Sequence, residues 1–115
     1  MPLISLKTSV EIPENKREAL LSELSKIVAE STGKPEQYVM AIIETADFMM
    51  GGHPSMAAFA DVRGIGGINR ETNAKISEKL CALLESRLSI SPQRVYINFT
   101  DIPASNWGCN GSTFG

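Results

Sequence analysis

The chain repeats one pattern of apolar and turn residues twice, and this repeat restricts the folds that it can adopt. In the first half, an apolar N-terminal stretch and a helical stretch lead to Gly33, after which residues 35–39 (PEQYV) open a new apolar run. In the second half, an apolar run and a helical stretch lead to Ser91, after which residues 92–96 (PQRVY) open the last run. The chain therefore reads as strand, helix, strand twice over. Two such units predict an α+β fold, a four-stranded mixed sheet with both helices on one face.

The bounds of these elements follow from apolar periodicity and from residues that start or stop a helix. We expect one helix to open at residues 12–14 and to stop at Gly33, and the other to follow Asn69 as its N-cap and to break at residues 91–92. The expected strands are residues 3–7, 38–46, 56–63 and 95–99. Strict alternation in the last strand places Tyr96 and Asn98 together, on the face away from the helices.

That face of the sheet has no helix to cover it, so we expect a partner there. A domain of 115 residues buries only about two-thirds of the surface that its unfolded chain exposes. A roomy internal pocket would remove much of the core, whereas a cleft between copies is easier to build. The tail, residues 103–115, carries Trp107 and Phe114, which indicates that it packs on something, such as another copy. We therefore predict a single domain over residues 1–115 that forms a homo-oligomer.

Charge and composition exclude several other classes of protein. The formal net charge is −2 and the eleven Lys and Arg residues are scattered, which argues against a nucleic-acid partner. No apolar run approaches the ~20 residues of a membrane span, and the N-terminal apolar stretch is too short for a signal peptide. We therefore expect a cytoplasmic protein without a membrane partner. Cys81 and Cys109 form neither a CxxC pair nor a zinc pattern, so we expect no metal and no cofactor.

The first residues, Met1 and Pro2, point to chemistry at the chain terminus. Pro2 is small enough for Met1 to be trimmed during synthesis, which would leave a free secondary amine on Pro2. Because a strand follows at once, this amine would be fixed to the sheet, where a first-position proline costs no ladder hydrogen bond. The simpler interpretation is that Pro2 has no catalytic role and is only a second residue that permits the removal of Met1.

Several blocks of residues, in order along the full length, resemble one family. They are Met1-Pro2, Thr32 to Pro35, Gln37-Tyr38, Gly51-Gly52, Ile65-Gly66, Ile90 to Pro92, Arg94 to Asn98 and Asn110 to Phe114. The chain resembles the macrophage migration inhibitory factor and D-dopachrome tautomerase family of the tautomerase superfamily. The resemblance implies a homotrimer in which three sheets form a central β barrel, with a site at each subunit boundary. It also implies keto–enol tautomerisation of aromatic 2-oxo acids, phenylpyruvate or hydroxyphenylpyruvate, with dopachrome-like substrates also expected.

The resemblance further assigns roles to individual residues. Pro2 would be the general acid/base, with Lys34 and the backbone of Ile65 beside it, and Lys34 would also attract the substrate carboxylate. The remaining substrate-binding residues would be Tyr96 and Asn98 of the neighbouring subunit, and Trp107 and Phe114 as walls of an aromatic pocket.

The chemistry explains why these residue types are needed. A group that moves a proton between carbon and oxygen needs a pKa near the working pH. Burial of the Pro2 amine and the nearby Lys34 charge would both lower its pKa. The turn at residues 65–67 precedes a helix, where free backbone amides attract anions.

Two other functions remain open at this point. Relatives act as cytokine-like ligands, so the chain would alternatively be a signalling module that binds a protein receptor. The sequence is also consistent with a carrier protein that binds aromatic acids without converting them. Residues 56–59 (MAAF) lack the CxxC of some relatives, and Cys109 stands where those relatives have a tryptophan. The preferred substrate therefore cannot be transferred from them.

Overall fold

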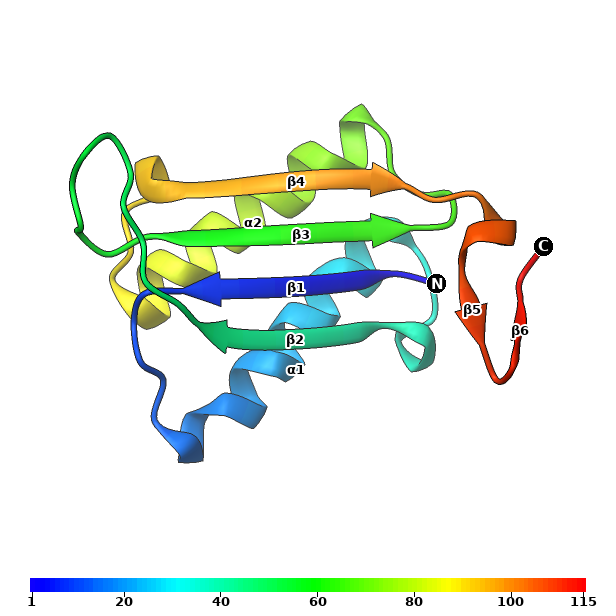
Figure 1. Cartoon of the computed structure of the whole chain (residues 1–115), viewed down its shortest axis with the longest axis horizontal. Coiled ribbons are helices and arrows are strands. Elements are labelled where there is room, and N and C mark those ends of the chain that lie inside the picture. Colours follow the sequence, from blue (N-terminus) through cyan, green and yellow to red (C-terminus); the bar gives the residue numbers. More distant parts are fainter.

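The computed structural model describes all 115 residues, and its elements follow the expected order (Figure 1). The helices and strands are β1 (Leu3–Thr8), α1 (Glu14–Thr32), β2 (Met40–Thr45), β3 (Ala58–Gly64), α2 (Arg70–Leu88), β4 (Val95–Asp101), β5 (Gly108–Cys109) and β6 (Ser112–Thr113). β2 and β3 each begin two residues later than expected. Before β2 the cause is Pro35, whose carbonyl accepts a hydrogen bond from the Tyr38 N–H at 3.2 Å and so draws residues 36–38 into a 3-10 turn.

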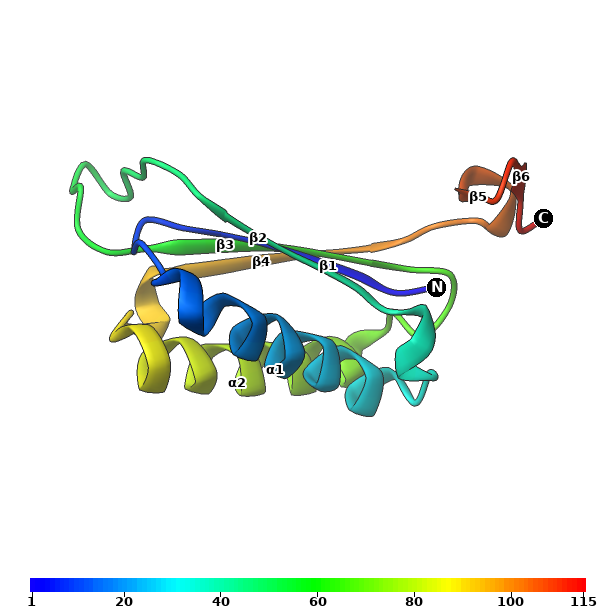
Figure 2. The same ribbon diagram turned by 90° about the horizontal axis from the view of Figure 1, so that it is seen from below.

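The main sheet has the strand order β2-β1-β3-β4. β1 is parallel to β2, β3 is parallel to β4, and the central pair β1 and β3 is antiparallel. Each helix therefore connects two parallel neighbours, and both helices cover the same face of the sheet (Figure 2). This arrangement confirms the expected pair of β-α-β units in a mixed sheet. It also places the start of the chain on a central strand rather than at a sheet edge.

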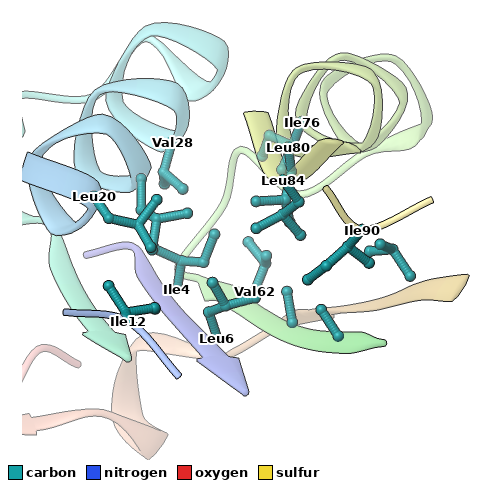
Figure 3. Packing of buried hydrophobic residues seen from close by; sticks show 14 residues of the cluster. Ile4, Leu6, Ile12, Leu20, Val28, Val62, Ile76, Leu80, Leu84 and Ile90 are labelled. Carbon is teal, nitrogen blue, oxygen red and sulfur yellow. The ribbon is translucent and has the colours of Figure 1, made fainter. Parts of the chain in front are cut away.

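The core lies between the sheet and the two helices. Figure 3 shows Leu20 and Val28 of α1, and Leu80 of α2, packed toward Ile4 and Val62 of the sheet. The cluster holds 14 buried apolar residues, all of them on the helix-facing side. Full burial of each Leu, Ile or Val side chain among them stabilises the fold by about 1.5–3 kcal/mol. This one layer of packing therefore fixes the sheet on which the chain terminus sits.

The helix ends follow local chemistry. Asn69 is the N-cap of α2, as predicted, because its side-chain oxygen accepts a hydrogen bond from the Thr72 N–H at 3.0 Å. Gly33 ends α1 with a φ of 72°, and its N–H bonds to the carbonyl of Ala29. α2 ends earlier than expected, at Leu88, because Ser89 takes a left-handed conformation with a φ of 59°. Neither helix is long and apolar enough to cross a membrane.

The other face of the sheet is uncovered, as expected (Figure 2). Alternation along β4 directs Val95, Ile97 and Phe99 toward the core cluster, whereas Tyr96 is 65% exposed on the open face. Met40 of β2 is also exposed there, at 61%. These apolar side chains lie on a face that no part of this chain covers.

Candidate active site

A cleft of about 670 Å³ lies where β1 begins. Its walls come from the chain terminus, from the turn before β2, from the end of β3 and from the C-terminal hairpin. The Met40 N–H donates to the Pro2 carbonyl at 3.1 Å and so extends the pairing of β1 and β2 to Pro2. The Pro2 side chain is fully buried. The terminal residues are thereby held to the rigid centre of the sheet.

The terminal amine sits where its protonated form is disfavoured. In the chain that begins with Met1, this amine belongs to Met1, and the nitrogen of Pro2 is an amide. Burial, and secondly the positive charge of Lys34, lower the pKa of the Met1 amine below its ordinary value. Removal of Met1 would move the amine by one residue, about 3.8 Å, from a half-buried position to the buried Pro2. The Met1 amine therefore stands in for the Pro2 amine of a trimmed chain.

Lys34 and Ile65 meet beside the terminus, although neither lines the cleft. The Lys34 Nζ donates a hydrogen bond to the carbonyl of Ile65. The lysine side chain crosses Gly67, where a Cβ atom would lie only 2.9 Å from the Lys34 Cε. Gly66 and Gly67 both have a positive φ, of 71° and 76°. This glycine turn leaves the space through which Lys34 reaches the terminus.

The expectation of free backbone amides in this turn is wrong for Gly66. Its N–H donates to the Asp101 Oδ1 at 3.0 Å, so that amide is already paired. The Ile65 carbonyl is the acceptor for the Lys34 Nζ. The Gly66 amide is therefore not available to an anion.

The tail forms a hairpin that brings two predicted aromatic residues to the cleft. β5 and β6 pair through a turn in which Asn110 and Gly111 have a φ of 52° and 78°, the pattern of a tight hairpin turn. The Phe114 N–H donates to the Trp107 carbonyl at 3.1 Å. Trp107 is half-buried and Phe114 is 41% exposed, and both line the cleft together with Pro2.

Tyr96 and Asn98 lie elsewhere in the same chain. The strand pairing places Leu3 opposite Arg63, Asn98 opposite Asp61, and Tyr96 opposite Phe59. Tyr96 is therefore four residues along the strands from the start of β1, or about 13 Å at 3.3 Å per residue. Neither residue belongs to the cleft of its own protomer. Their part in a site remains a prediction that depends on a neighbouring copy.

The structure adds cleft residues that sequence reasoning missed. They include Gln37 and Tyr38 before β2, Met40, and Arg63 at the end of β3. Arg63 forms an ion pair with Asp61, with 2.8 Å between its Nη2 and the Asp61 Oδ2. This carboxylate raises the pKa of the Arg63 guanidinium through hydrogen bonding and charge. The only sequence signal for Arg63 was its alternation with Phe59 and Asp61 along one strand.

A second hollow, of about 520 Å³, lies between the start of α1 and the end of α2. An ion pair of Arg87 and Glu23, at 3.0 Å, links the two helices at its wall. None of the predicted site residues lines this hollow. The predicted residues that do line a cavity all belong to the cleft at the terminus.

Comparison with known proteins agrees with this arrangement. The family profile described as "Macrophage migration inhibitory factor (MIF)" matches residues 1–115. The macrophage migration inhibitory factor of Mus musculus is 41% identical over 118 residues, covering 99% of both chains. A crystal structure of the homologue from Prochlorococcus marinus superimposes with a TM-score of 0.92 at 38% identity, covering 98% of this chain and 99% of the other. The Toxoplasma gondii protein gives a TM-score of 0.93 at 34% identity, covering 97% and 99%. The chain belongs to the macrophage migration inhibitory factor family.

Proposed function

We propose that the chain is a keto–enol tautomerase of aromatic 2-oxo acids, with phenylpyruvate or hydroxyphenylpyruvate as substrate and dopachrome-like compounds as further candidates. The observation that carries the proposal is the environment of the chain terminus. A buried Pro2 adjoins a cleft with aromatic walls, and burial together with Lys34 lowers the pKa of the terminal amine. A lower pKa increases the neutral fraction of the amine at a given pH, and the neutral amine is the form that accepts a proton.

In the proposed mechanism, Met1 has been removed and the neutral Pro2 amine takes a proton from the carbon next to the substrate carbonyl. The electron pair of the broken C–H bond moves into the new C=C bond, and the carbonyl oxygen becomes an enolate. The protonated Pro2 amine then gives its proton to the oxygen, which yields the enol and restores the neutral amine; the reverse reaction follows the same path. Burial and, secondly, Lys34 favour the neutral amine, and Lys34 adds positive charge near the developing anion. The aromatic ring would lie against Trp107 and Phe114.

The site would be completed by a second protomer. We propose a homotrimer in which the open sheet faces turn inward as a barrel and each seam receives Tyr96 and Asn98 from the neighbour. Asn98 is an amide that could donate to the enolate oxygen. Support comes from the 65% exposure of Tyr96 and the lack of any covering element on this face. Light scattering at three times 12.5 kDa would support the trimer, and a monomer would contradict it.

Two measurements test the enzyme proposal. Intact mass determines whether Met1 is absent, and therefore whether the Pro2 amine exists. Ultraviolet absorption then follows the conversion between keto and enol phenylpyruvate. Pro2→Gly is expected to lower kcat/KM by at least about 100-fold, the lower end of general acid/base contributions. Full activity of this variant, or of protein that keeps Met1, would refute the proline mechanism.

A second candidate function is signalling through a protein receptor, which the names of the curated relatives favour. In that case Pro2→Gly would leave receptor binding intact while turnover is lost. Tight binding of phenylpyruvate without isotope exchange at the carbon next to the carbonyl would indicate a carrier instead.

A further inference from the structure

Asp101, the last residue of β4, is bonded to the glycine turn that follows β3. The register of β3 and β4 places Asp101 directly opposite Gly64. Alternation along β4 puts Asp101 on the same face as Phe99, the face that the helices cover. The Asp101 Oδ1 accepts a hydrogen bond from the Gly66 N–H at 3.0 Å, and the Ile102 N–H donates to the Gly64 carbonyl at 2.8 Å. The turn is therefore tied to the end of β4 by one side-chain bond and one backbone bond.

The glycines of this turn give it little stiffness of its own. Gly66 and Gly67 both have a positive φ, and glycine has more backbone freedom than any other residue. A residue with a Cβ atom at position 67 would press on the Lys34 side chain, so the turn cannot be stiffened there without moving the lysine. The turn therefore depends on restraints from outside, and Asp101 is the one side chain that accepts a hydrogen bond from its backbone.

The same turn positions Lys34. The Ile65 carbonyl, one residue before Gly66, is the acceptor for the Lys34 Nζ. Asp101 therefore acts on Lys34 through the turn and forms no ion pair with it. Lys34 is in turn the second cause, after burial, that lowers the pKa of the terminal amine. The other titratable side chains in the cleft wall are Tyr38, Arg63 and Cys109. None of these three side chains is a cause of the lowered pKa.

We propose that Asp101 is a positioning residue for the tautomerase reaction, which holds the Ile65 carbonyl where that carbonyl keeps the Lys34 ammonium group beside the chain terminus. The inference rests on the proposed tautomerase function and extends it to a residue that does not line the cleft. Without the bond from Asp101 the turn loosens and the ammonium group moves away from the amine. The pKa of the amine then rises, and its neutral fraction at acidic pH falls. The hydrogen bond is the active feature rather than the negative charge, because Asp101 is not itself a cause of the shifted pKa of the amine.

The test compares Asp101→Ala, which removes the acceptor, with Asp101→Asn, which keeps an oxygen acceptor and removes only the charge. Asn69→Ala is the control for stability, because it removes an acceptor that binds the Thr72 N–H, also at 3.0 Å, and has no bond to the turn or to Lys34. With phenylpyruvate as substrate, Asp101→Ala is expected to move the acidic limb of kcat/KM to higher pH. On that limb kcat/KM should fall by about 10-fold, the lower end for a hydrogen bond to a charged group, and the loss should diminish as the pH rises. Asp101→Asn should restore most of the activity, and Asn69→Ala should unfold at a lower temperature with an unmoved limb. An unmoved limb in Asp101→Ala, or an equal movement in either of the other variants, would overturn the proposal.

A titration of the amine separates this inference from the proposed function. NMR of protein with isotope-labelled proline follows the Pro2 signals as the pH changes, and Pro2→Gly identifies those signals by their loss. Labelled methionine reports the amine in the same way in protein that keeps Met1. The pKa of the amine is expected to be higher in Asp101→Ala than in Asp101→Asn and in the unaltered protein, whether or not phenylpyruvate is turned over. An equal pKa in Asp101→Ala and the unaltered protein would refute the role of Asp101. Missing turnover with a pKa that depends on Asp101 would instead refute the tautomerase proposal alone.

Discussion

Substitution of one glycine offers a test of how Lys34 acts on the chain terminus. Gly67→Ala would place a Cβ atom 2.9 Å from the Lys34 Cε, whereas ordinary contacts begin at 3.4 Å. The lysine chain is flexible at this point, so it is expected to move by at least about 0.5 Å rather than force the backbone apart. This movement would draw the ammonium group from the Ile65 carbonyl and away from the amine.

The expected magnitudes follow from these distances. Misplacing a catalytic group by about 1 Å costs up to roughly 100-fold in rate, so half that displacement predicts a loss of about 10-fold in kcat/KM. A weaker influence of Lys34 also raises the pKa of the terminal amine, because one of the two causes that lower it is removed. The reaction needs the neutral amine, so the loss should be greatest at acidic pH and should diminish as the pH rises.

Gly66→Ala is the matched control. Gly66 also has a positive φ, of 71°, but its Cβ would lie 3.8 Å from the Lys34 Nζ, an ordinary contact. Both alanine variants therefore carry the left-handed backbone penalty of about 1–2 kcal/mol, and only Gly67→Ala displaces the lysine. Thermal unfolding at equal protein concentration should show similar destabilisation, and the pH profile of tautomerisation should separate them. An equal loss of activity in both variants, or none in either, would refute the reasoning.

Three further changes test the site and its frame. Lys34→Met removes the charge itself, so the acidic limb of the rate profile should move to higher pH; an unchanged limb would mean that burial alone sets the pKa. Arg94→Leu removes a guanidinium that donates to the carbonyls of residues 50, 53, 55 and 56 at 2.8–3.3 Å. The variant should be destabilised by about 1–3 kcal/mol, and proteolysis of the 50–56 loop should be faster. Unchanged cleavage of this loop would contradict the role of Arg94. Asn69→Ala removes the α2 N-cap and should cost about 1 kcal/mol, which equilibrium denaturation measures; an unchanged midpoint would mean that packing alone holds the helix end.

The main architecture could be predicted because it depends on local patterns. Apolar periodicity defined both helices and all four strands of the main sheet, and the alternation around Tyr96 identified the open face. The starts of β2 and β3 were less accurate, each by two residues. Before β2 the reason is the proline-led turn, which forms a 3-10 helix. The C-terminal hairpin was missed although Asn110-Gly111 is a recognised hairpin signal. Its strands have only two residues each, too few for alternation to be visible.

The candidate site was predictable only in part, for a different physical reason. Pro2, Lys34 and Ile65 were expected together through the family resemblance, whereas Arg63 was not expected at all. Its place beside the terminus depends on the pairing of Leu3 with Arg63, two residues that are sixty positions apart in sequence. Alternation shows which face a strand residue occupies, but it does not show which residue of another strand lies opposite. A site built across strands therefore appears only when the register is known.

The strand order explains how a chain terminus can serve as a buried base. Chain termini usually lie at the protein surface, where an amine keeps its ordinary pKa. Here the first strand lies inside the sheet, between β2 and β3, so the residue that precedes it is flanked on both sides. β2 fixes the Pro2 backbone through the Met40 N–H, and β3 supplies Arg63 on the other side. Placing β1 at a sheet edge would expose the amine to water and separate it from one of these two neighbours. The same topology that forms the core therefore also creates the desolvated position on which the proposed chemistry depends.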